Sequence, residues 1–322
     1  MLKIEGLNRS FGDRQVLHDV AFGVERGRLT GFVGGNGAGK TTTMRIILGV
    51  LAADSGSVTL DGHPLTAADR VDFGYMPEER GLYPKMKVAE QVAYLGRLHG
   101  LDRGAAMDRA RDLLDRLGLG ERADEPLENL SLGNQQRAQI AAALVHDPQV
   151  LVLDEPFSGL DPLAVDVVVG VLAEYAASGV PVLFSSHQLE LVEKLCDDLV
   201  IISGGRIRAA GGREELRTAF GHTRFELLTD GDAGWVRSAP GVQVVDFDGG
   251  YVLFEAEEDA AQAVLRDALG RAAVRSFAPV RPTLGEIFRG VVADAESSES
   301  SGSTESSGSP ESPALPEMEV AR

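Results

Sequence analysis

One glycine-rich loop constrains this chain more than any other feature. Residues 34–41 read Gly34-Gly35-Asn36-Gly37-Ala38-Gly39-Lys40-Thr41 and satisfy the pattern G-x-x-x-x-G-K-[ST]. An apolar run at 30–33 precedes the loop and a helical segment at 41–50 follows it. Because such a loop connects a strand to a helix, the chain must contain an α/β sheet. A dinucleotide fingerprint is excluded, since Lys40 stands where its third glycine is required.

The residue types of this loop indicate that it binds a nucleotide. Glycines let backbone N–H groups curl around phosphates, and the helix that follows adds its positive dipole end. Lys40 is expected to reach the β- and γ-phosphates, and the Thr41 hydroxyl to ligate Mg²⁺. We therefore predict that a nucleotide and Mg²⁺ are bound, with nucleotide contacts from Gly34, Gly35, Asn36, Gly37, Ala38, Gly39, Lys40, Thr41 and Thr42.

Residues 1–215 carry the pattern of one α/β domain. Continuous apolar runs at 150–153, 182–184 and 199–202 predict strands of a sheet that is covered on both faces. Between about 85 and 146 the apolar residues recur at helical spacing instead. We therefore expect a helical subdomain inserted into the domain.

Two acidic residues, Asp154 and Glu155, directly follow the apolar run at 150–153. This position is the carboxyl edge of the sheet, where open α/β folds bind nucleotides. Asp154 is predicted to ligate Mg²⁺. Glu155 is expected to point to the opposite side of the strand line and to accept or orient the proton of an attacking water.

A second, smaller domain is predicted at 222–292. Strand patterns at 225–228, 242–245 and 251–254 precede a helix, a further strand near 273–274 and a last helix near 286–288. This order fits a small α+β unit, for which a ferredoxin-like arrangement is a candidate. It shows no catalytic constellation, so we interpret it as an accessory domain. Residues 293–322 are rich in serine and acidic residues, which predicts a disordered tail.

Charge and composition exclude several classes of protein. The net charge of -18 opposes phosphodiester backbones, so we expect no direct binding of nucleic acid. The single cysteine, Cys196, excludes a framework of internal disulfides. No run approaches the roughly 18 apolar residues of a transmembrane helix, and we expect no signal peptide at residues 1–6. Any membrane association is therefore expected to come through a partner.

Four further motifs give the chain a close resemblance to ATP-binding-cassette (ABC) ATPases over residues 1–215. The family's signature is matched at 130–137, and its loop after the acidic pair is matched at 158–161. The residues 185–187 match the family's switch histidine, and Phe11 stands where the family places an aromatic for adenine. This resemblance implies a P-loop ATPase fold.

The resemblance also implies roles that the residues alone leave open. Ser131 and Gly133 are expected to open a helix as an anion site that closes on the γ-phosphate held by a second copy, with Asp161 in the nearby loop. His187 is expected to hydrogen-bond the γ-phosphate, and Phe11 to stack on adenine. Without the resemblance, His187 would be read as a surface histidine. The alternative for Phe11 is packing in the core, which we favour less than stacking on adenine.

Two departures from the family pattern stand out. Glu78 replaces the usual glutamine that senses the metal, although a carboxylate can still ligate Mg²⁺. In the signature, Leu132 and Asn134 replace the usual glycine and glutamine. We expect ATP still to bind, with Ser131 and Gly133 supplying the anion site.

The phrases at 74–84 and 282–288 resemble a bacterial exporter branch that includes sodium-efflux and antibiotic-resistance ATPases. We therefore predict an ATP-hydrolysing subunit of an export transporter, with Glu155, His187 and Lys40 as its catalytic residues. Its expected partners are a second copy and a separate multi-span permease, which would hold it on the cytoplasmic face of the plasma membrane. The alternatives are a soluble ABC ATPase acting on ribosomes, DNA or protein, and an importer subunit.

Overall fold

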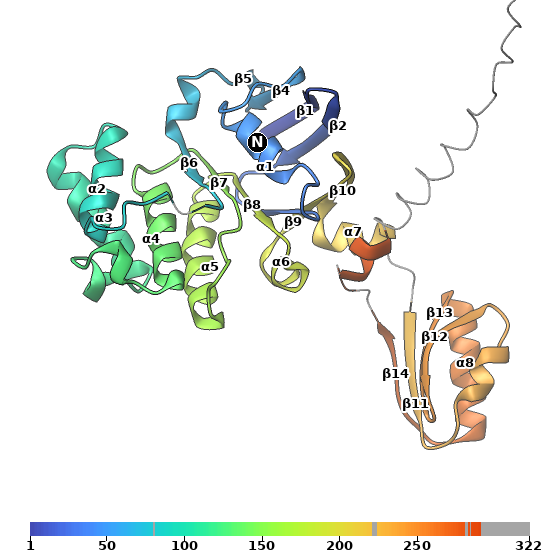
Figure 1. Ribbon diagram of the computed structural model, residues 1–322. Coiled ribbons are helices and arrows are strands. Elements are labelled where there is room, and N and C mark those ends of the chain that lie inside the picture. Colours follow the sequence, from blue (N-terminus) through green and yellow to red (C-terminus); the bar gives the residue numbers. More distant parts are fainter. Residues whose placement is uncertain (80, 221–223, 281–282, 284, 291–322) are drawn as a thin grey trace, which may run out of the picture.

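The computed structural model describes residues 1–79, 81–220, 224–280, 283 and 285–290. Its central sheet has six strands (Figure 1). In spatial order these are β10 (Arg206–Gly212), β9 (Asp198–Ser203), β3 (Leu29–Val33), β8 (Val182–Ser186), β7 (Val150–Leu153) and β6 (Phe73–Met76). All neighbours pair in parallel except β10, which runs antiparallel to β9 at one edge. The predicted α/β sheet is therefore confirmed.

The central strands are mostly apolar because the sheet is buried on both faces, with Thr30 of β3 and Ser185 and Ser186 of β8 as buried polar exceptions. Along β7, Val150 and Val152 face one hydrophobic core while Leu151 and Leu153 face another, and all four are fully buried. Adjacent residues of a strand point to opposite faces, so a strand between two cores favours apolar side chains at every position.

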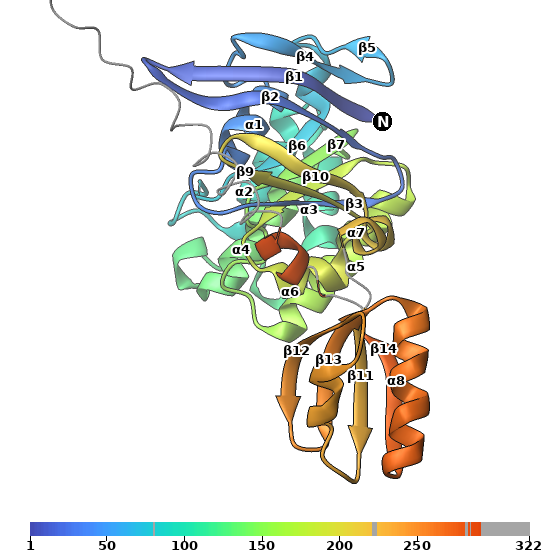
Figure 2. The ribbon, with the colours of Figure 1, turned by 90° about the vertical axis from the view of Figure 1, so that its right-hand side faces the viewer.

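One face of the sheet is covered by helix α1 (Lys40–Ile47) and by a four-stranded antiparallel sheet (Figure 2). In spatial order its strands are β2 (Arg14–Val24), β1 (Leu2–Phe11), β4 (Ser55–Leu60) and β5 (His63–Pro64). Met44 and Ile47 of α1 are fully buried in the core between these layers. Burial of this apolar side anchors the helix that follows the glycine-rich loop.

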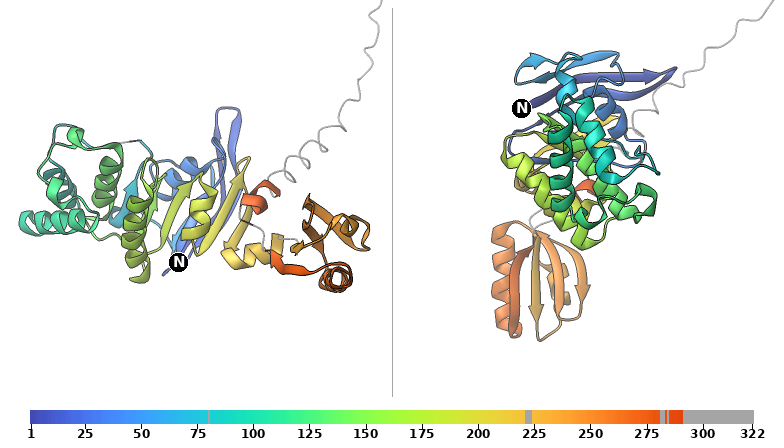
Figure 3. Two further views of the ribbon diagram at one scale, coloured as in Figure 1. Left: turned by 90° about the horizontal axis from the view of Figure 1, so that it is seen from below. Right: turned by 90° about the vertical axis from the view of Figure 1, so that its left-hand side faces the viewer.

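The opposite face is covered by helices, which include the predicted helical subdomain (Figure 3). They are α2 (Val88–Leu98), α3 (Arg103–Arg116), α4 (Leu132–Leu144), α5 (Pro162–Ala177) and α6 (Leu189–Leu195), with short 3-10 turns η1 (Asp69–Asp72), η2 (Gly120–Arg122) and η3 (Leu127–Asn129). The core on this side joins residues of α2, α3 and α4 to residues of the sheet. Helix α7 (Arg213–Phe220) follows β10.

The C-terminal unit has its own core and its own sheet. The sheet order is β12 (Val242–Asp248), β13 (Tyr251–Ala256), β11 (Arg224–Thr229) and β14 (Val274–Val280), with every pair antiparallel. Helix α8 (Glu258–Arg271) packs on one face through Ala261 and Val264. This is the ferredoxin-like order, with a 3-10 turn, η4 (Gly234–Ser238), in place of the first helix.

The segment at 285–290 is helical and returns to the larger unit. Ile287 is 3% exposed and belongs to the hydrophobic core that the sheet shares with α2–α6. Arg224 Nη1 donates to Glu286 Oε1 at 2.6 Å and so ties this helix to the start of β11. No helix among the described residues has the length and apolar character to cross a membrane. The predicted disordered tail at 293–322 lies outside the described residues.

Two stacked histidines join α2, α4 and β6. The rings of His99 and His146 lie 3.7 Å apart, and His146 Nε2 lies 3.3 Å from the carbonyl oxygen of Phe73. Burial, with the neighbouring His99, lowers the pKa of His146 from 6.5 to about 4. The folded protein therefore holds His146 neutral at pH values where the unfolded chain protonates it.

We predict that this histidine makes the folded state less stable in mild acid. The free energy of unfolding should fall as the pH drops from about 6.5 towards 4, because the unfolded chain binds the extra proton. Between pH 7 and pH 5 the parent should lose about 1 kcal/mol more than His146→Gln, after allowance for solvent screening of a partly exposed ring. Urea unfolding at both pH values measures the difference. Equal losses in the two proteins would contradict the prediction.

Candidate active site

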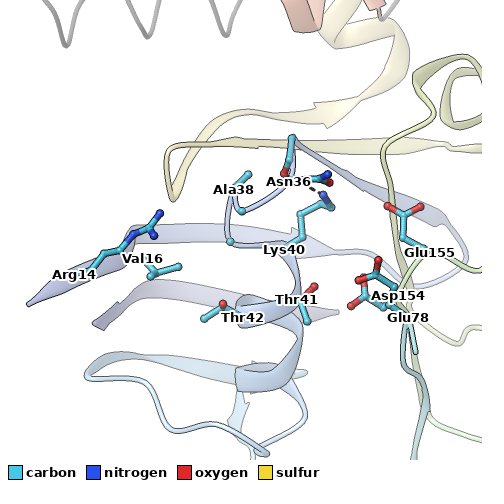
Figure 4. A pocket seen from close by; sticks show the side chains of 13 residues that line it. Arg14, Val16, Asn36, Ala38, Lys40, Thr41, Thr42, Glu78, Asp154 and Glu155 are labelled. Atoms are coloured by element: carbon cyan, nitrogen blue, oxygen red, sulfur yellow. Dashed lines mark hydrogen bonds between the residues drawn. The ribbon is translucent and has the colours of Figure 1, made fainter. Parts of the chain in front are cut away.

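The glycine-rich loop is wrapped around the side chain of Lys40, the first residue of α1 (Figure 4). Its Nζ donates to the carbonyl oxygen of Gly34 at 2.7 Å and to that of Gly35 at 3.3 Å. Lys40 is 8% exposed. The ammonium group is therefore held inside the loop, where the phosphates of a nucleotide would be bound.

Close packing explains two of the glycines. A Cβ on Gly34 would lie 2.5 Å from the carbonyl oxygen of Ile202, and one on Gly39 would lie 2.6 Å from Leu17 Cδ2. Gly39 also has a φ of 112°, a conformation that favours glycine. The loop thus keeps its shape because strands β2 and β9 press directly on its backbone.

The predicted phosphate and metal residues, with the exception of Gly34, line one cavity of about 430 Å³ (Figure 4). The structure brings together Gly35, Asn36, Gly37, Ala38, Gly39, Lys40, Thr41, Thr42, Glu78, Asp154 and Glu155, and adds Arg14 and Val16. These residues come from the loop, from β2 and from the ends of β6 and β7. The carboxyl edge of the sheet therefore holds the site.

The environment of Asp154 fits a bound divalent cation. Its Oδ1 accepts a hydrogen bond from Ser185 Oγ at 2.5 Å, whereas its buried Oδ2 has no hydrogen-bond partner among the described residues. A buried carboxylate oxygen without a donor is costly unless something positive meets it. The hydroxyl of Thr41 and the carboxylate of Glu78 line the same cavity and complete an oxygen donor set suited to Mg²⁺.

Glu155 lies just beyond the end of a strand. Strand β7 ends at Leu153, and Glu155 has a φ of 52°, in the left-handed region. Asp154 and Glu155 line the same cavity. The expectation that the two side chains point to opposite sides of the strand line stays a prediction.

The carboxylate of Glu155 faces His187. Its Oε1 lies 2.9 Å from His187 Nδ1, while the Glu155 side chain is 11% exposed and that of His187 is 57% exposed. A buried carboxylate next to an accessible imidazole is an arrangement suited to accepting and orienting a proton. The structure thus joins two residues that the sequence placed 32 positions apart.

The residues of the signature lie outside this cavity. Ser131 is the N-cap of α4, and its Oγ accepts from the Asn134 N–H at 3.3 Å. A Cβ on Gly133 would lie 3.1 Å from the carbonyl oxygen of Gly159, so the signature and the 158–161 loop are adjacent. Asp161 caps α5 by accepting from the Ala164 N–H at 2.8 Å. Their roles in nucleotide binding stay predictions that require a second copy.

Phe11 stands at the end of β1 and does not line the cavity either. Phe11 is 48% exposed, and the Arg9 guanidinium lies over its ring, 4.9 Å from the ring centroid. It pairs across the hairpin with Arg14, which does line the cavity. Stacking of Phe11 on adenine therefore stays a prediction. Arg14 and Val16 were not predicted as site residues, although their alternation along the strand after residue 12 contains the signal.

Comparison with known proteins identifies the family. The profile described as "ABC transporter" matches residues 17–158, and the profile described as "ATP-binding protein DrrA1-3-like, C-terminal domain" matches residues 211–292. A relative in Bacillus subtilis, the uncharacterized ABC transporter ATP-binding protein YhaQ, is 38% identical over 89% of this chain and 97% of its own. The chain belongs to the ABC transporter ATP-binding proteins.

Further relatives of this ABC protein have more specific names. The linearmycin resistance ATP-binding protein LnrL of Bacillus subtilis is 35% identical over 71% of this chain and 75% of its own. The Nod factor export ATP-binding protein I of Ralstonia nicotianae is 39% identical over 68% of this chain and 69% of its own.

Solved structures agree with the fold. An ATP-binding subunit of an ABC transporter matches with a TM-score of 0.63 and 33% identity, over 69% of this chain and 93% of its own. The bacterial ABC transporter cassette MJ0796, whose structure is dimeric, matches with a TM-score of 0.61 over 66% of this chain and 99% of its own. At 20% identity the second match supports the fold alone. The P-loop ABC ATPase fold is confirmed, and membership of the family implies that the chain binds ATP and has ATPase activity.

We predict that Lys40→Ala weakens ATP binding at least about tenfold. The substitution removes a cation from the phosphate loop, and a hydrogen bond to a charged group contributes about 1.5–3 kcal/mol. Calorimetric titration with ATP measures the dissociation constant. Lys3→Ala, which removes an exposed lysine paired with Glu5, is the matched control and should bind like the parent. Equal affinities in all three proteins would show that Lys40 does not contact the nucleotide.

Proposed function

We propose that this ABC protein is the ATP-hydrolysing subunit of an export transporter, with Glu155 and His187 acting directly on the reaction. The observation that carries the catalytic part is the contact between their side chains beside the phosphate loop. The proposal keeps the division of the chain into an ATPase domain at 1–215 and an accessory domain at 222–292. ATP is the substrate, and Mg²⁺ is the implied cofactor.

Each residue then has a chemical task. Lys40 and the loop N–H groups would bind the phosphates, and Thr41, Glu78 and Asp154 would hold Mg²⁺. Bound there, the ion would neutralise charge on the phosphate oxygens. Glu155 would accept or orient the proton of the attacking water, and His187 would hold the γ-phosphate in line with it.

We further propose that two copies close around two ATP molecules. Leu132 in the signature is 58% exposed, and Leu163, just after the 158–161 loop, is 79% exposed. Large apolar side chains on a surface next to a helix N-terminus are expected to be covered by a partner. A second copy would cover them and bring its own ATP to Ser131 and Gly133.

The predicted test of the catalytic assignment is Glu155→Gln. Hydrolysis should fall by about a hundredfold or more, because an amide cannot accept the proton. ATP should still bind and should now hold the protein as a long-lived dimer, which size-exclusion chromatography detects. Glu174→Gln changes a carboxylate that is 69% exposed and should behave like the parent. A Glu155→Gln protein that hydrolyses ATP at the parent rate and forms no dimer would refute the role.

The export part of the proposal depends on the C-terminal unit and on named relatives. The DrrA1-3-like profile covers 211–292, and relatives at 35% and 39% identity have names that state linearmycin resistance and Nod factor export. An exporter subunit of this kind requires a permease that spans the membrane. The protein would then lie in the cytoplasm, on the inner face of the plasma membrane.

A face of the helical subdomain suits the permease. Tyr94 and Leu98 stand one helical turn apart on α2 and are 43% and 63% exposed. Val71 of η1 is 55% exposed, and its carbonyl oxygen lies 2.8 Å from His99 Nδ1 at the end of the same helix. We propose that Val71, Tyr94 and Leu98 form the docking face for the permease, beside Glu78 and β6.

We predict that Leu98→Glu disrupts recovery of the permease. The tagged parent, extracted gently from membranes of its native cell, should co-purify with a multi-span protein that mass spectrometry identifies. The amount of this protein recovered with the variant should be at least about tenfold lower. A charge cannot be buried in an apolar contact without a partner. Leu269→Glu on α8, at the same 63% exposure, is the matched control and should keep the permease.

Other outcomes would redirect the proposal. Recovery of the parent only with ribosomes, DNA or soluble proteins would favour the soluble class of ABC ATPase. A permease whose transport depends on an external solute-binding protein would instead identify an importer.

A further inference from the structure

Three glutamines of helix α4 hold three separate loops through their side-chain amides. Gln135 Nε2 donates to the carbonyl oxygens of Leu127 and Leu130, at 3.2 and 3.0 Å. Gln139 and Gln136, which are 4% and 3% exposed, act in the same way on the loops of the nucleotide site. The buried glutamines are therefore placed where they connect the signature helix to the active site.

Gln136 contacts the loop 154–161 between β7 and α5, which carries Glu155 and is called the catalytic loop below. Its Nε2 donates to the carbonyl oxygen of Glu155 at 3.0 Å and to that of Pro156 at 3.2 Å. On the other side of the same Cα, the Glu155 N–H donates to Ser185 Oγ at 2.9 Å. Both peptide groups that flank the Glu155 Cα are thus hydrogen-bonded to buried side chains.

This clamp explains how Glu155 keeps its backbone conformation. A φ of 52° is unfavourable for a residue with a Cβ and persists only where the surroundings impose it. Because the two flanking peptide planes are fixed, the direction of the Cα–Cβ bond is fixed as well. That direction aims the carboxylate at His187 and at the cavity.

The same helix also holds the loop that carries Glu78. Gln139 Nε2 donates to the carbonyl oxygens of Pro77 and Glu79, at 2.9 and 3.3 Å. Helix α4 begins at the signature, where Ser131 is its N-cap. One rigid element therefore contacts the signature surface, the catalytic loop and the loop of the proposed metal ligand.

We propose that Gln136 is a positioning residue that sets the carboxylate of Glu155, and that it ties this carboxylate to the signature of the same subunit. The inference rests on the proposed function. In a closed dimer the signature contacts the ATP held by the partner, whereas Glu155 acts on the ATP of its own subunit. A shift of α4 on γ-phosphate binding at one site is thereby transmitted to the catalytic carboxylate of the other.

The test is Gln136→Met, which keeps the length of the side chain and removes its donors. The kcat for ATP hydrolysis should fall about tenfold to a hundredfold, since a misplaced catalytic group loses rate on this order. The KM for ATP should change less than about twofold, because the phosphate loop is untouched. The Hill coefficient for ATP should fall towards 1 if α4 connects the two sites.

A matched variant separates positioning from stability. Gln91 is 2% exposed, and its amide pairs with the backbone of Tyr83 in the helical subdomain. Gln91→Met should lower the midpoint of thermal unfolding about as much as Gln136→Met does, but its kcat should equal that of the parent. If Gln136→Met does not fold, Gln136→Asn replaces it. The kcat of Gln136→Asn should also fall, by a smaller factor.

A double variant tests the route of the effect. In the Glu155→Gln background, Gln136→Met should slow the residual hydrolysis no further, because it acts through the carboxylate that is already lost. The inference would be overturned if the two substitutions reduced kcat independently in the double variant, so that their effects multiplied. It would also be overturned if Gln136→Met had the same kcat as Gln91→Met. Should Glu155→Gln alone leave hydrolysis unchanged, the proposed function fails instead, and the two failures are distinguishable.

Discussion

The burial of the central strands on both faces is the constraint that places every part of the active site. Strands β3 and β7 lie between two hydrophobic cores and are almost entirely apolar, so the charged side chains of the site stand beyond the strand ends. Parallel pairing brings those ends to one edge, where the phosphate loop follows β3 and the acidic pair follows β7. The packing of the sheet therefore brings the phosphate loop and the acidic pair together at one edge.

Electrostatics at this edge are arranged by neutral groups as much as by charges. Carbonyl oxygens of the loop solvate Lys40, and the hydroxyl of Ser185 bonds one oxygen of Asp154 and the N–H of Glu155. What stays unmatched is the second oxygen of Asp154, which has no donor among the described residues. A site that holds a buried anion in this way is prepared for a cation, because the ion supplies the missing partner.

Helix α4 shows how a buried polar side chain extends this arrangement beyond the cavity. An amide that donates to two carbonyl oxygens adds hydrogen bonds to the backbone of a loop and ties that loop to the helix. Gln136 and Gln139 do so for the catalytic loop and for the loop of Glu78. The C-terminal unit is joined to the same core by Ile287, so it is not merely tethered by a linker.

Much of the fold could be predicted from sequence because its signals are local. The G-x-x-x-x-G-K-[ST] loop, the apolar run before Asp154 and the helical spacing of 85–146 each depend on neighbours in the chain. The same holds for the order of strands and helix along the C-terminal unit, and the structure shows the ferredoxin-like arrangement that this order made a candidate. Contacts between distant segments carry no such signal. The direction of Glu155, its approach to His187, the cavity position of Arg14 and the clamp by Gln136 were decided only by tertiary structure, because each depends on where separate elements pack and not on what precedes the residue in the chain.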